Sequence, residues 1–434
     1  MKNCVYAAVF FFLLGTVVFW FFYKPETQPK TALFSPEHIK PISLFHYFSG
    51  SLSGGLGEMI DTVNKRIPQQ KVFAQPLDHE AFKSMILSTL AKGTPPELFT
   101  YWAGVKTQEL VDQGKLEPID DIWQAIPLTG RFATPVAEAA STYNGRKYLL
   151  PITQHFVVFF YNKRLFNREN LTSPASWEEL TDLSEKLTAR GLTAFALGAK
   201  ERWPAQFWFD YLLLRTAGPE YRQALMDGKA AYTDREVALA YSMWASLIKN
   251  GSFNADANSL DWAEATQLVC SGKAAMTLMG TWAIQAFTAA ECGLAEESGF
   301  DFFVFPTINP DVPATAVGPV DGIVLAKDST NHEVAKTVLS YFSEVEPQQR
   351  LSEGSGALAP SSEVAKQNYS ALRQRILAAS EASSHWAFNY DLATKAEIAD
   401  KGMDSFNELI AFPDQSEEIL EHLQAAVANI RSRH

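Results

Sequence analysis

Cysteine is scarce in this chain. Among its 434 residues the only cysteines are Cys4, Cys270 and Cys292. No His or Cys lies at metal-ligand spacing around Cys270 or Cys292, which excludes a structural zinc site of the usual kind there. Two interpretations of this pair stay open. Cys270 and Cys292 form one disulfide if the body of the chain is exported, or they are two separate buried thiols.

Positive charge is also scarce. The chain has 37 Lys and Arg against 49 Asp and Glu, which gives a formal net charge of -12 and a sequence pI of about 5.2. Binding a nucleic acid requires a basic face that neutralises phosphate groups. No dense group of Lys and Arg occurs in the sequence. We therefore predict no nucleic-acid partner.

The common catalytic motifs are missing. The sequence contains no H-E-x-x-H, no G-x-S-x-G and no Cys–His pairing motif. The adjacent carboxylates Asp120–Asp121 and Glu178–Glu179 point in different directions and cannot flank one glycosidic bond as a local motif. We therefore predict a protein that is not an enzyme and that needs neither a cofactor nor a metal. A glycan-degrading enzyme assembled from distant carboxylates is the alternative.

The one long apolar run lies at the N-terminus. Residues 5–23 carry no charge, and a run of this length can span the hydrocarbon core of a bilayer. Bulky side chains occupy Trp20–Tyr23, where a cleavable signal has small residues. We predict an uncleaved signal anchor over 1–23 and a linker over 24–40, with a cleaved signal peptide as the alternative. The body then lies in the periplasm or at the outer face of the cytoplasmic membrane.

Strands and helices alternate along the rest of the chain. Hydrophobic residues make up 47% of the sequence and charged residues 20%, which is ordinary for a globular chain long enough for two domains. Repeated β-α-β units predict an α/β fold with parallel sheets, and Asn144–Gly145 predicts a hairpin turn. We expect strands over 42–48, 71–77, 97–101, 156–161, 192–197, 274–279, 301–305, 322–326 and 357–359, and helices over 79–92, 332–342, 394–411 and 415–431.

The segment Gly272–Ala283 carries the strongest local pattern. A small apolar strand over 274–279 runs into Gly280, and Thr281 is a good N-cap for a following helix. Trp282 then stands just beyond a strand end, which is where open α/β sheets bind ligands. A flat indole at this place is a natural platform for a sugar ring.

Three blocks in order resemble a known family. The first runs from Tyr143–Asn144–Gly145 through Leu150–Pro151–Ile152 to Phe160–Phe166, with Ser176–Leu180 downstream; the second is Gly272–Ala283; the third comprises Phe305–Pro306, Gly318–Leu325 and Ala335–Phe342. Their order and spacing are similar to family 1 of the extracellular solute-binding proteins, the maltose-binding-protein-like sugar receptors of ABC importers. This resemblance implies a type II periplasmic-binding-protein fold, with two Rossmann-like α/β lobes joined by a three-segment hinge.

The resemblance also implies where the lobes divide. The N-terminal lobe is expected to hold 41–153 and 320–357, and the C-terminal lobe 156–317 and 360–434. The chain would cross between them near 151–156, near 316–322 and near 355–360. Closure driven by a ligand requires contacts from both lobes, because the closed form must bind it better than the open form.

Four tryptophans are candidate stacking residues. Trp102 and Trp282 follow predicted strand ends, and family members offer an aromatic side chain near the position of Trp203. Trp386 lies where the last segment is expected to return to the cleft. The alternative role for each indole is to pack a helix against a sheet.

The candidate polar residues lie at the expected crossings and in the first loop. Asp321 can accept hydrogen bonds from sugar hydroxyls or stabilise a hinge, and His155 can contact a ligand or be a satisfied buried side chain. The full set of polar candidates is Gln154, His155, Asp321 and Gly322, with Ser49, Ser51, Glu58, Ser355 and Gly356 as weaker ones.

The expected ligand is a neutral carbohydrate, namely a disaccharide, a glucoside or a sugar-like osmolyte. Few candidate positions are cationic, Arg202 being the exception, and this argues against an acidic ligand. The resemblance implies an ABC permease as partner, and we expect a monomer tethered to the membrane by its N-terminal segment. An amino acid, a polyamine or a ferric ion is the alternative ligand, and a sensor subunit without transport is the alternative role.

Overall fold

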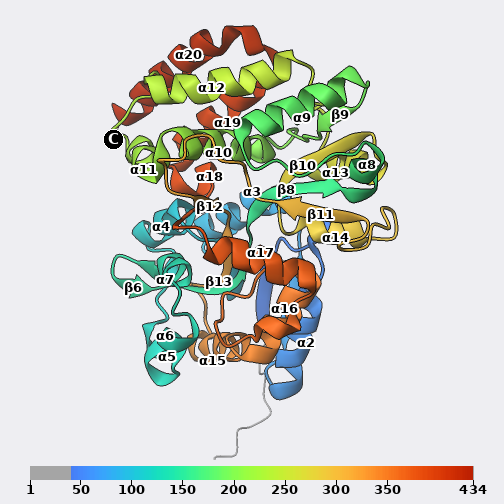
Figure 1. The fold of residues 1–434 in the computed structure, drawn as a ribbon. Helices are drawn as coiled ribbons and strands as arrows, with labels where there is room; N and C mark the ends of the chain where they lie inside the picture. The colour runs from blue at the N-terminus through green and yellow to red at the C-terminus, as the bar shows by residue number, and fades with distance from the viewer. Residues whose placement is uncertain (1–40, 434) are drawn as a thin grey trace, which may run out of the picture. The chain divides into compact units, whose positions relative to one another are not determined.

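Two β-sheets, each covered by helices, organise the chain from residue 41 onward (Figure 1). The computed structural model describes residues 41–433, which belong to one compact unit. The predicted anchor and linker over 1–40 lie outside the described residues. Across 41–433, no helix combines the length and the apolar character needed to cross a membrane.

The first sheet is mixed rather than parallel. Its strands are β1 (Ile42–His46), β2 (Val72–Pro76), β3 (Leu98–Trp102), β4 (Leu116–Glu117), β7 (Leu149–Gln154) and β13 (Val320–Ala326). Parallel pairing, as predicted, joins β1 to β2 and β3, but β13 runs antiparallel to β3, β4 and β7. The prediction of a fully parallel sheet was wrong because β13 enters this sheet from the opposite direction, late in the sequence.

The second sheet has the order β11-β8-β10-β9. Its strands are β8 (Val157–Asn162), β9 (Thr193–Phe195), β10 (Ala274–Gly280) and β11 (Phe300–Phe303). β10 pairs parallel with β9 and antiparallel with β8, and every residue of β10 is buried. Small and apolar side chains along β10 suit a central strand that is covered on both faces.

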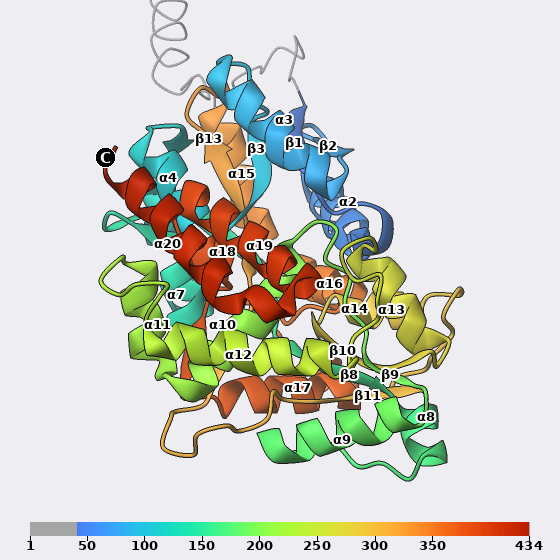
Figure 2. The same ribbon diagram turned by 90° about the horizontal axis from the view of Figure 1, so that it is seen from above.

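Helices surround each sheet separately. Around the first are α2 (Leu56–Arg66), α3 (His79–Ala91), α4 (Val105–Asp112), α5 (Asp120–Ala125), α6 (Leu128–Arg131), α7 (Pro135–Ser141), α15 (His332–Phe342) and α16 (Val345–Ser355). Around the second are α8 (Lys163–Arg168), α9 (Trp177–Ala189), α10 (Gln206–Thr216), α11 (Gly218–Met226), α12 (Arg235–Lys249), α13 (Trp262–Cys270), α14 (Ala283–Thr288), α17 (Ala371–Glu381), α18 (Tyr390–Ala393), α19 (Ala396–Ala411) and α20 (Ser416–Arg431). Figures 1 and 2 show α12, α19 and α20 packed side by side at the far end of the second sheet.

Two hydrophobic cores accompany the two sheets. One is built from residues within 42–152 and 320–351, together with Leu392. The other is built from residues within 156–317 and 372–427. We call the parts of the body around these cores the N-terminal lobe and the C-terminal lobe. The α/β class with two lobes is as predicted.

Three chain segments lie side by side between the lobes. Gln154 and Leu358 exchange two backbone hydrogen bonds, each 2.9 Å long, and the amide of His155 donates to the carbonyl of Pro319 at 3.0 Å. A Cβ atom on Gly318 would lie 1.7 Å from the carbonyl oxygen of His155, so only glycine permits this close approach. The strand predicted over 357–359 is reduced to a single bridge at Leu358.

Local sequence signals agree with the structure in two places and disagree in one. Ser176 caps α9 by accepting from the amide of Glu179, and Asn144–Gly145 forms the predicted hairpin between β5 (Thr142–Tyr143) and β6 (Arg146–Lys147). The prediction that Thr281 caps the next helix was wrong. α14 begins at Ala283, and the hydroxyl of Thr281 instead pairs with Nδ1 of His155 at 2.9 Å.

A disulfide joins Cys270 and Cys292, whose Cα atoms are 5.2 Å apart. It links the end of α13 to the loop that follows α14. The segment between the two cysteines contains the whole of β10 and Trp282, so the bond closes a loop around the strand end singled out by the sequence.

Candidate functional site

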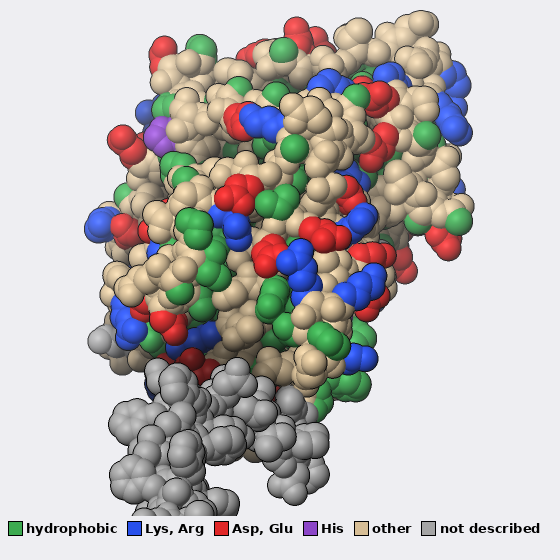
Figure 3. Space-filling view, turned by 90° about the horizontal axis from the view of Figure 1, so that it is seen from below, with side chains coloured by type: hydrophobic (Ala, Val, Ile, Leu, Met, Phe, Trp, Pro, Cys, Tyr) green, Lys and Arg blue, Asp and Glu red, His purple; other side chains and the backbone are tan. Residues whose placement is uncertain are grey.

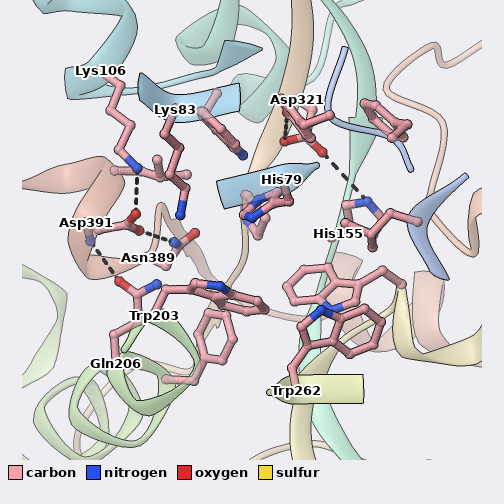
Figure 4. A pocket seen from close by; sticks show the side chains of 18 of the residues that line it. His79, Lys83, Lys106, His155, Trp203, Gln206, Trp262, Asp321, Asn389 and Asp391 are labelled. Carbon is pink, nitrogen blue, oxygen red and sulfur yellow. Dashed lines mark hydrogen bonds and ion pairs between the residues drawn. The ribbon is translucent and has the colours of Figure 1, made fainter. Parts of the chain in front are cut away.

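A cleft lies between the two lobes (Figure 4). Side chains from both lobes line it, and they come mainly from strand ends and from the helices that follow. The carboxyl ends of β1 and β3 reach it from one lobe, and the carboxyl end of β10 reaches it from the other.

The N-terminal wall consists of Tyr47, His79, Lys83, Trp102 and Lys106. Tyr47 directly follows β1 and Trp102 ends β3, and these two strands are parallel neighbours. The two rings therefore stack, with their centroids 4.3 Å apart and an angle of 9° between their planes. The ammonium group of Lys106 lies 5.0 Å from the ring centroid of Trp102, within the distance of a cation–π contact.

The C-terminal wall consists of Trp203, Phe207, Trp262 and Trp282. Trp203 opens the short 3-10 helix η2 (Trp203–Ala205) and Phe207 lies one turn later in α10. Trp203 meets Trp282 at 5.8 Å and 64°, and Phe207 at 5.9 Å and 73°. These edge-to-face contacts hold the rings in place without stacking one on another.

Asp321 lies between the walls on β13. Its carboxylate accepts hydrogen bonds from the hydroxyl of Tyr47 at 2.7 Å and from that of Thr153 at 2.6 Å. Burial raises the pKa of Asp321 to about 6, although these two hydrogen bonds favour the charged form. Burial lowers the pKa of His155 to about 3, so this imidazole is neutral near pH 7. The 3.7 Å contact between His155 and Asp321 is therefore not an ion pair at that pH.

A second carboxylate of the cleft is held by a lysine. Lys106 donates to Asp391 at 2.7 Å, the amide of Asn389 donates to the same carboxylate at 2.6 Å, and the backbone amide of Asp391 donates to Gln206 at 2.8 Å. Burial by itself would raise the pKa of Asp391, but the charges of Lys106 and Lys83 and the hydrogen bonds to Lys106 and Gln206 together outweigh burial, and the pKa is lowered.

The two lysines leave the cleft without excess positive charge. Lys83 donates to both carboxylate oxygens of Glu80, at 2.8 and 2.9 Å, and Lys106 is paired with Asp391. Each ammonium group therefore stands beside a carboxylate. Such pairs place hydrogen-bond donors and acceptors next to each other, which suits a hydroxyl group because it both donates and accepts.

The structure brings six of the candidate residues together in the cleft. The lining includes Trp102, His155, Trp203, Trp282, Asp321 and Ser355. Gln154 and Gly322 do not line it. Gln154 pairs with Leu358 at the crossing, and Gly322 lies in β13 where a Cβ atom would be 2.0 Å from Cδ2 of Leu149.

The other candidates lie elsewhere. Trp386 belongs to β14 (His385–Ala387), donates to the carbonyl of Gly318 at 3.2 Å and lines a separate hollow beside α11. Ser49 donates to the carbonyl of Leu77 and lines a separate pocket next to the cleft. Glu58 is exposed on α2, and Gly356 ends α16 with φ +74°. Ser51 falls in η1 (Gly50–Leu52), and its side chain is outside what the structure describes.

Sequence reasoning missed several lining residues. The most important are Tyr47, Lys83, Lys106, Gln206, Phe207, Trp262, Asn389 and Asp391. Trp262 had a usable signal, because Asp261 and Glu264 form a capping box that makes Trp262 the first residue of a helix. No local sequence signal marked Asn389 or Asp391, since both lie in the cleft only because the chain returns between the lobes late in the sequence.

No metal-binding cluster is found in the described part. Among residues 41–433, no group of three or more His, Cys, Asp or Glu could hold a metal ion. Figure 3 shows the end of the body near α15, where Lys and Arg side chains alternate with Asp and Glu. Lys336 with Asp121 and Arg131 with Glu363 are ion pairs of this region.

The fold and the cleft define a two-lobed α/β binding protein. The sequence matches the bacterial extracellular solute-binding protein family over residues 49–349. The chain therefore belongs to this family, as the resemblance implied, and the family is extracellular by description.

Individual relatives agree with this assignment. An uncharacterised ABC transporter extracellular-binding protein of Pyrococcus horikoshii is 27% identical over 361 residues, which is 80% of this chain and 78% of that protein. A probable sugar-binding periplasmic protein of Mesorhizobium japonicum is 29% identical over 168 residues, covering 38% and 39% of the two chains. The solved structure of the bacterial solute receptor AcbH, described as preferring β-D-galactopyranose, matches with a TM-score of 0.80 and 26% identity, covering 90% of this chain and 99% of that one.

Proposed function

We propose that this protein is the substrate-binding receptor of an ABC importer and that it captures a neutral carbohydrate in the cleft. The observation that carries the proposal is the composition of the two walls. Aromatic rings of both lobes face a cleft whose lysines are each paired with a carboxylate. Aromatic surfaces suit the C–H faces of sugars, and the balanced charges suit hydroxyl groups rather than an acidic ligand.

The related proteins support the same ligand class. The proteins similar to this chain include a probable sugar-binding protein, a receptor for β-D-galactopyranose and a chitin oligosaccharide binding protein. The ligands named for these proteins differ from one another. The sugar bound by this chain therefore depends on its own lining residues.

Capture is proposed to occur by closure of the two lobes about the three crossing segments. Lys106 lies on α4 of the N-terminal lobe, and the backbone amide of Asp391 on α18 donates to Gln206 of α10 in the C-terminal lobe, although Leu392 of α18 belongs to the N-terminal core. Their ion pair therefore joins the lobes beside the cleft. A ligand held between the two walls favours the closed form, because only that form offers it both walls.

The remaining parts of the proposal concern its setting. The closed receptor delivers its ligand to the permease of the importer and performs no catalysis. It acts as a monomer in the periplasm or at the outer face of the cytoplasmic membrane, tethered by residues 5–23.

A thermal-shift screen of the full chain tests the ligand class. Neutral mono- and disaccharides and glycosides are compared with amino acids, polyamines and ferric citrate. A ligand that binds only the folded form raises the melting temperature, and at a concentration 100 times its Kd it adds about 2.7 kcal/mol of stability. We expect a shift with a carbohydrate, lost in Trp203→Ala and kept in the exposed control Leu239→Ala. A shift with amino acids, polyamines or iron alone would reject the carbohydrate assignment.

A further inference from the structure

The pocket that Ser49 lines adjoins the cleft, and we call it the outer pocket. Four residues line both spaces, namely Leu52, His79, Trp203 and Trp262. The outer pocket adds seven further residues, which are Ser49, Gly50, Asp78, Glu80, Glu201, Asp261 and Ala263. Gly50, Asp78 and Glu80 are exposed, so the outer pocket lies where the cleft reaches the surface.

Both lobes contribute to the outer pocket, as they do to the cleft. Ser49 comes from the N-terminal lobe and Glu201 from the C-terminal lobe. His79 and Trp203 meet across the boundary between the lobes, with ring centroids 6.1 Å apart. A ligand that continues outward from the cleft therefore still contacts both lobes. Its extra length adds to the contacts that only the closed form offers.

Two indoles connect the cleft to the outer pocket. Trp203 in η2 and Trp262 at the start of α13 line both spaces. Figure 4 shows these two side chains on the side of the cleft away from Asp321. Aromatic surfaces suit the C–H faces of sugar rings. Because each indole borders both spaces, a chain of sugar rings that runs outward stays in contact with aromatic surface.

The outer pocket also contains a carboxylate oxygen without a partner. Asp78 caps α3 and Asp261 caps α13. Glu80 is paired with Lys83. Oε2 of Glu201, in contrast, is buried and has no hydrogen-bond partner among the described residues. Burial, and after it the negative charge of Asp261, raises the pKa of Glu201.

This carboxylate suits a ligand that donates hydrogen bonds. A buried acceptor without a partner is unfavourable, and a hydroxyl that donates to Oε2 of Glu201 would satisfy it. Among the described residues that line the outer pocket there is no Lys or Arg, so the pocket offers no cation to an acidic ligand. A sugar ring carries several hydroxyl donors on its edge and apolar C–H groups on its faces, which matches Glu201 together with the two indoles.

We propose that the outer pocket is a further subsite and that the ligand is an oligosaccharide, which runs from the cleft past Trp203 and Trp262 and places an outer sugar ring there. This inference rests on the proposed function and narrows it from neutral carbohydrates in general to chains of at least two sugar rings. The outer ring donates a hydroxyl to Glu201 and contacts the indoles. Glu201 binds the outer ring alone, because it lines the outer pocket and not the cleft.

Sugars of increasing length test the proposal on the full chain. Isothermal titration measures the Kd of the mono-, di- and trisaccharide in five series, which are the cello-, malto-, xylo-, manno- and chito-oligosaccharides. In at least one series we expect the Kd to fall about tenfold from the monosaccharide to a longer member, because the outer ring adds a hydrogen bond and aromatic contacts. A monosaccharide that binds as tightly as every longer sugar would overturn the subsite alone. If no member of any series binds, the proposed carbohydrate function fails as well.

Variants of Glu201 locate the outer ring. Glu201→Ala should weaken the longer sugar about fivefold and leave the Kd of the monosaccharide within about twofold, since Glu201 does not line the cleft. Glu201→Gln keeps an acceptor oxygen and should recover part of the loss. The control Glu178→Ala removes an exposed carboxylate of α9 outside both spaces and should change neither Kd.

Two results with Glu201→Ala would contradict the assignment. An unchanged Kd for the longer sugar would mean that no ring reaches the outer pocket. An equal loss for the monosaccharide and the longer sugar would mean that Glu201 acts on the cleft as a whole. A monosaccharide that binds weakly is measured by its competition with the longer sugar. Thermal unfolding of each variant without ligand checks that the fold is retained.

Discussion

The two walls of the cleft use the same residue type in different ways. On the N-terminal wall, the ring of Trp102 is stacked on Tyr47 and lies near the ammonium groups of Lys106 and Lys83, at 5.0 and 6.0 Å from its centroid. On the C-terminal wall, no ring in the described part stacks on Trp203, whose neighbours are tilted or edge-on. A tryptophan that lines the cleft can therefore organise charged groups or offer a face to a ligand.

The largest expected effect separates these two roles. Trp102→Ala removes a side chain that is 8% exposed and the partner of Tyr47, so we expect the free energy of unfolding to fall by about 4 kcal/mol. Trp203→Ala should cost less stability and more ligand affinity, because its ring is only partly buried. Denaturant unfolding of both variants measures the loss of stability. Titration with the carbohydrate found in the thermal-shift screen measures the loss of affinity. Equal losses of stability would contradict the division of roles.

The next prediction concerns the ion pair that crosses the cleft. Lys106→Met leaves the buried carboxylate of Asp391 without its cation, and breaking a buried pair in this way should cost about 3 kcal/mol of stability. The double variant Lys106→Met/Asp391→Asn removes both charges and should recover a large part of this loss. Urea unfolding of the single and double variants provides the measurement. A double variant no more stable than Lys106→Met would mean that the pair does not stabilise the closed arrangement.

The sequence predicted the fold better than the site. Strand positions were readable because buried β-strands such as β10 are short apolar runs with clear ends. The direction of β13 was not readable, since a strand that returns from the other lobe has the same apolar pattern whichever way it runs. Alternating strands and helices predict the relative direction only of strands that follow one another in the sequence. β13 joins the sheet more than two hundred residues after β3.

Within the site, local signals found residues at strand ends and missed residues on helices. Trp282 and Asp321 were accessible because a glycine next to a strand end marks a loop at the sheet edge. Lys83 and Lys106 have the appearance of ordinary surface lysines on α3 and α4, since nothing in their local sequence indicates the contact of Lys106 with Asp391, 285 residues away. Trp386 was chosen from its place in the sequence, but its indole is turned to the carbonyl of Gly318 instead of the cleft.

The smallest expected effect sharpens the contrast between the two carboxylates of the cleft. Asp321 has no lysine partner, and burial raises its pKa from 3.8 to about 6. The folded state therefore binds more protons than the unfolded state between these values. The contribution of Asp321 to stability is complete below pH 3.8 and is lost as the pH rises through 6, with a loss of roughly 2 kcal/mol between pH 4 and pH 7. The contribution of Asp391 changes with pH in the opposite direction. Because its pKa is lowered in the folded state, Asp391 stabilises the fold at neutral pH, and this stabilisation is lost as the pH falls below 3.8.

Asparagine variants measure both signs in one experiment. Asp321→Asn removes the titration, so its stability relative to the natural chain should improve by roughly 2 kcal/mol between pH 4 and pH 7. Asp391→Asn should become worse relative to the natural chain as the pH rises from about 2 to about 5, because the stability that comes from a lowered pKa is complete above the unfolded value of 3.8. Urea unfolding at constant ionic strength gives both differences. If the relative stability of both variants changed in the same direction with pH, Lys106 would not control the charge of Asp391. Burial alone would then have to account for any difference in pKa between the two carboxylates.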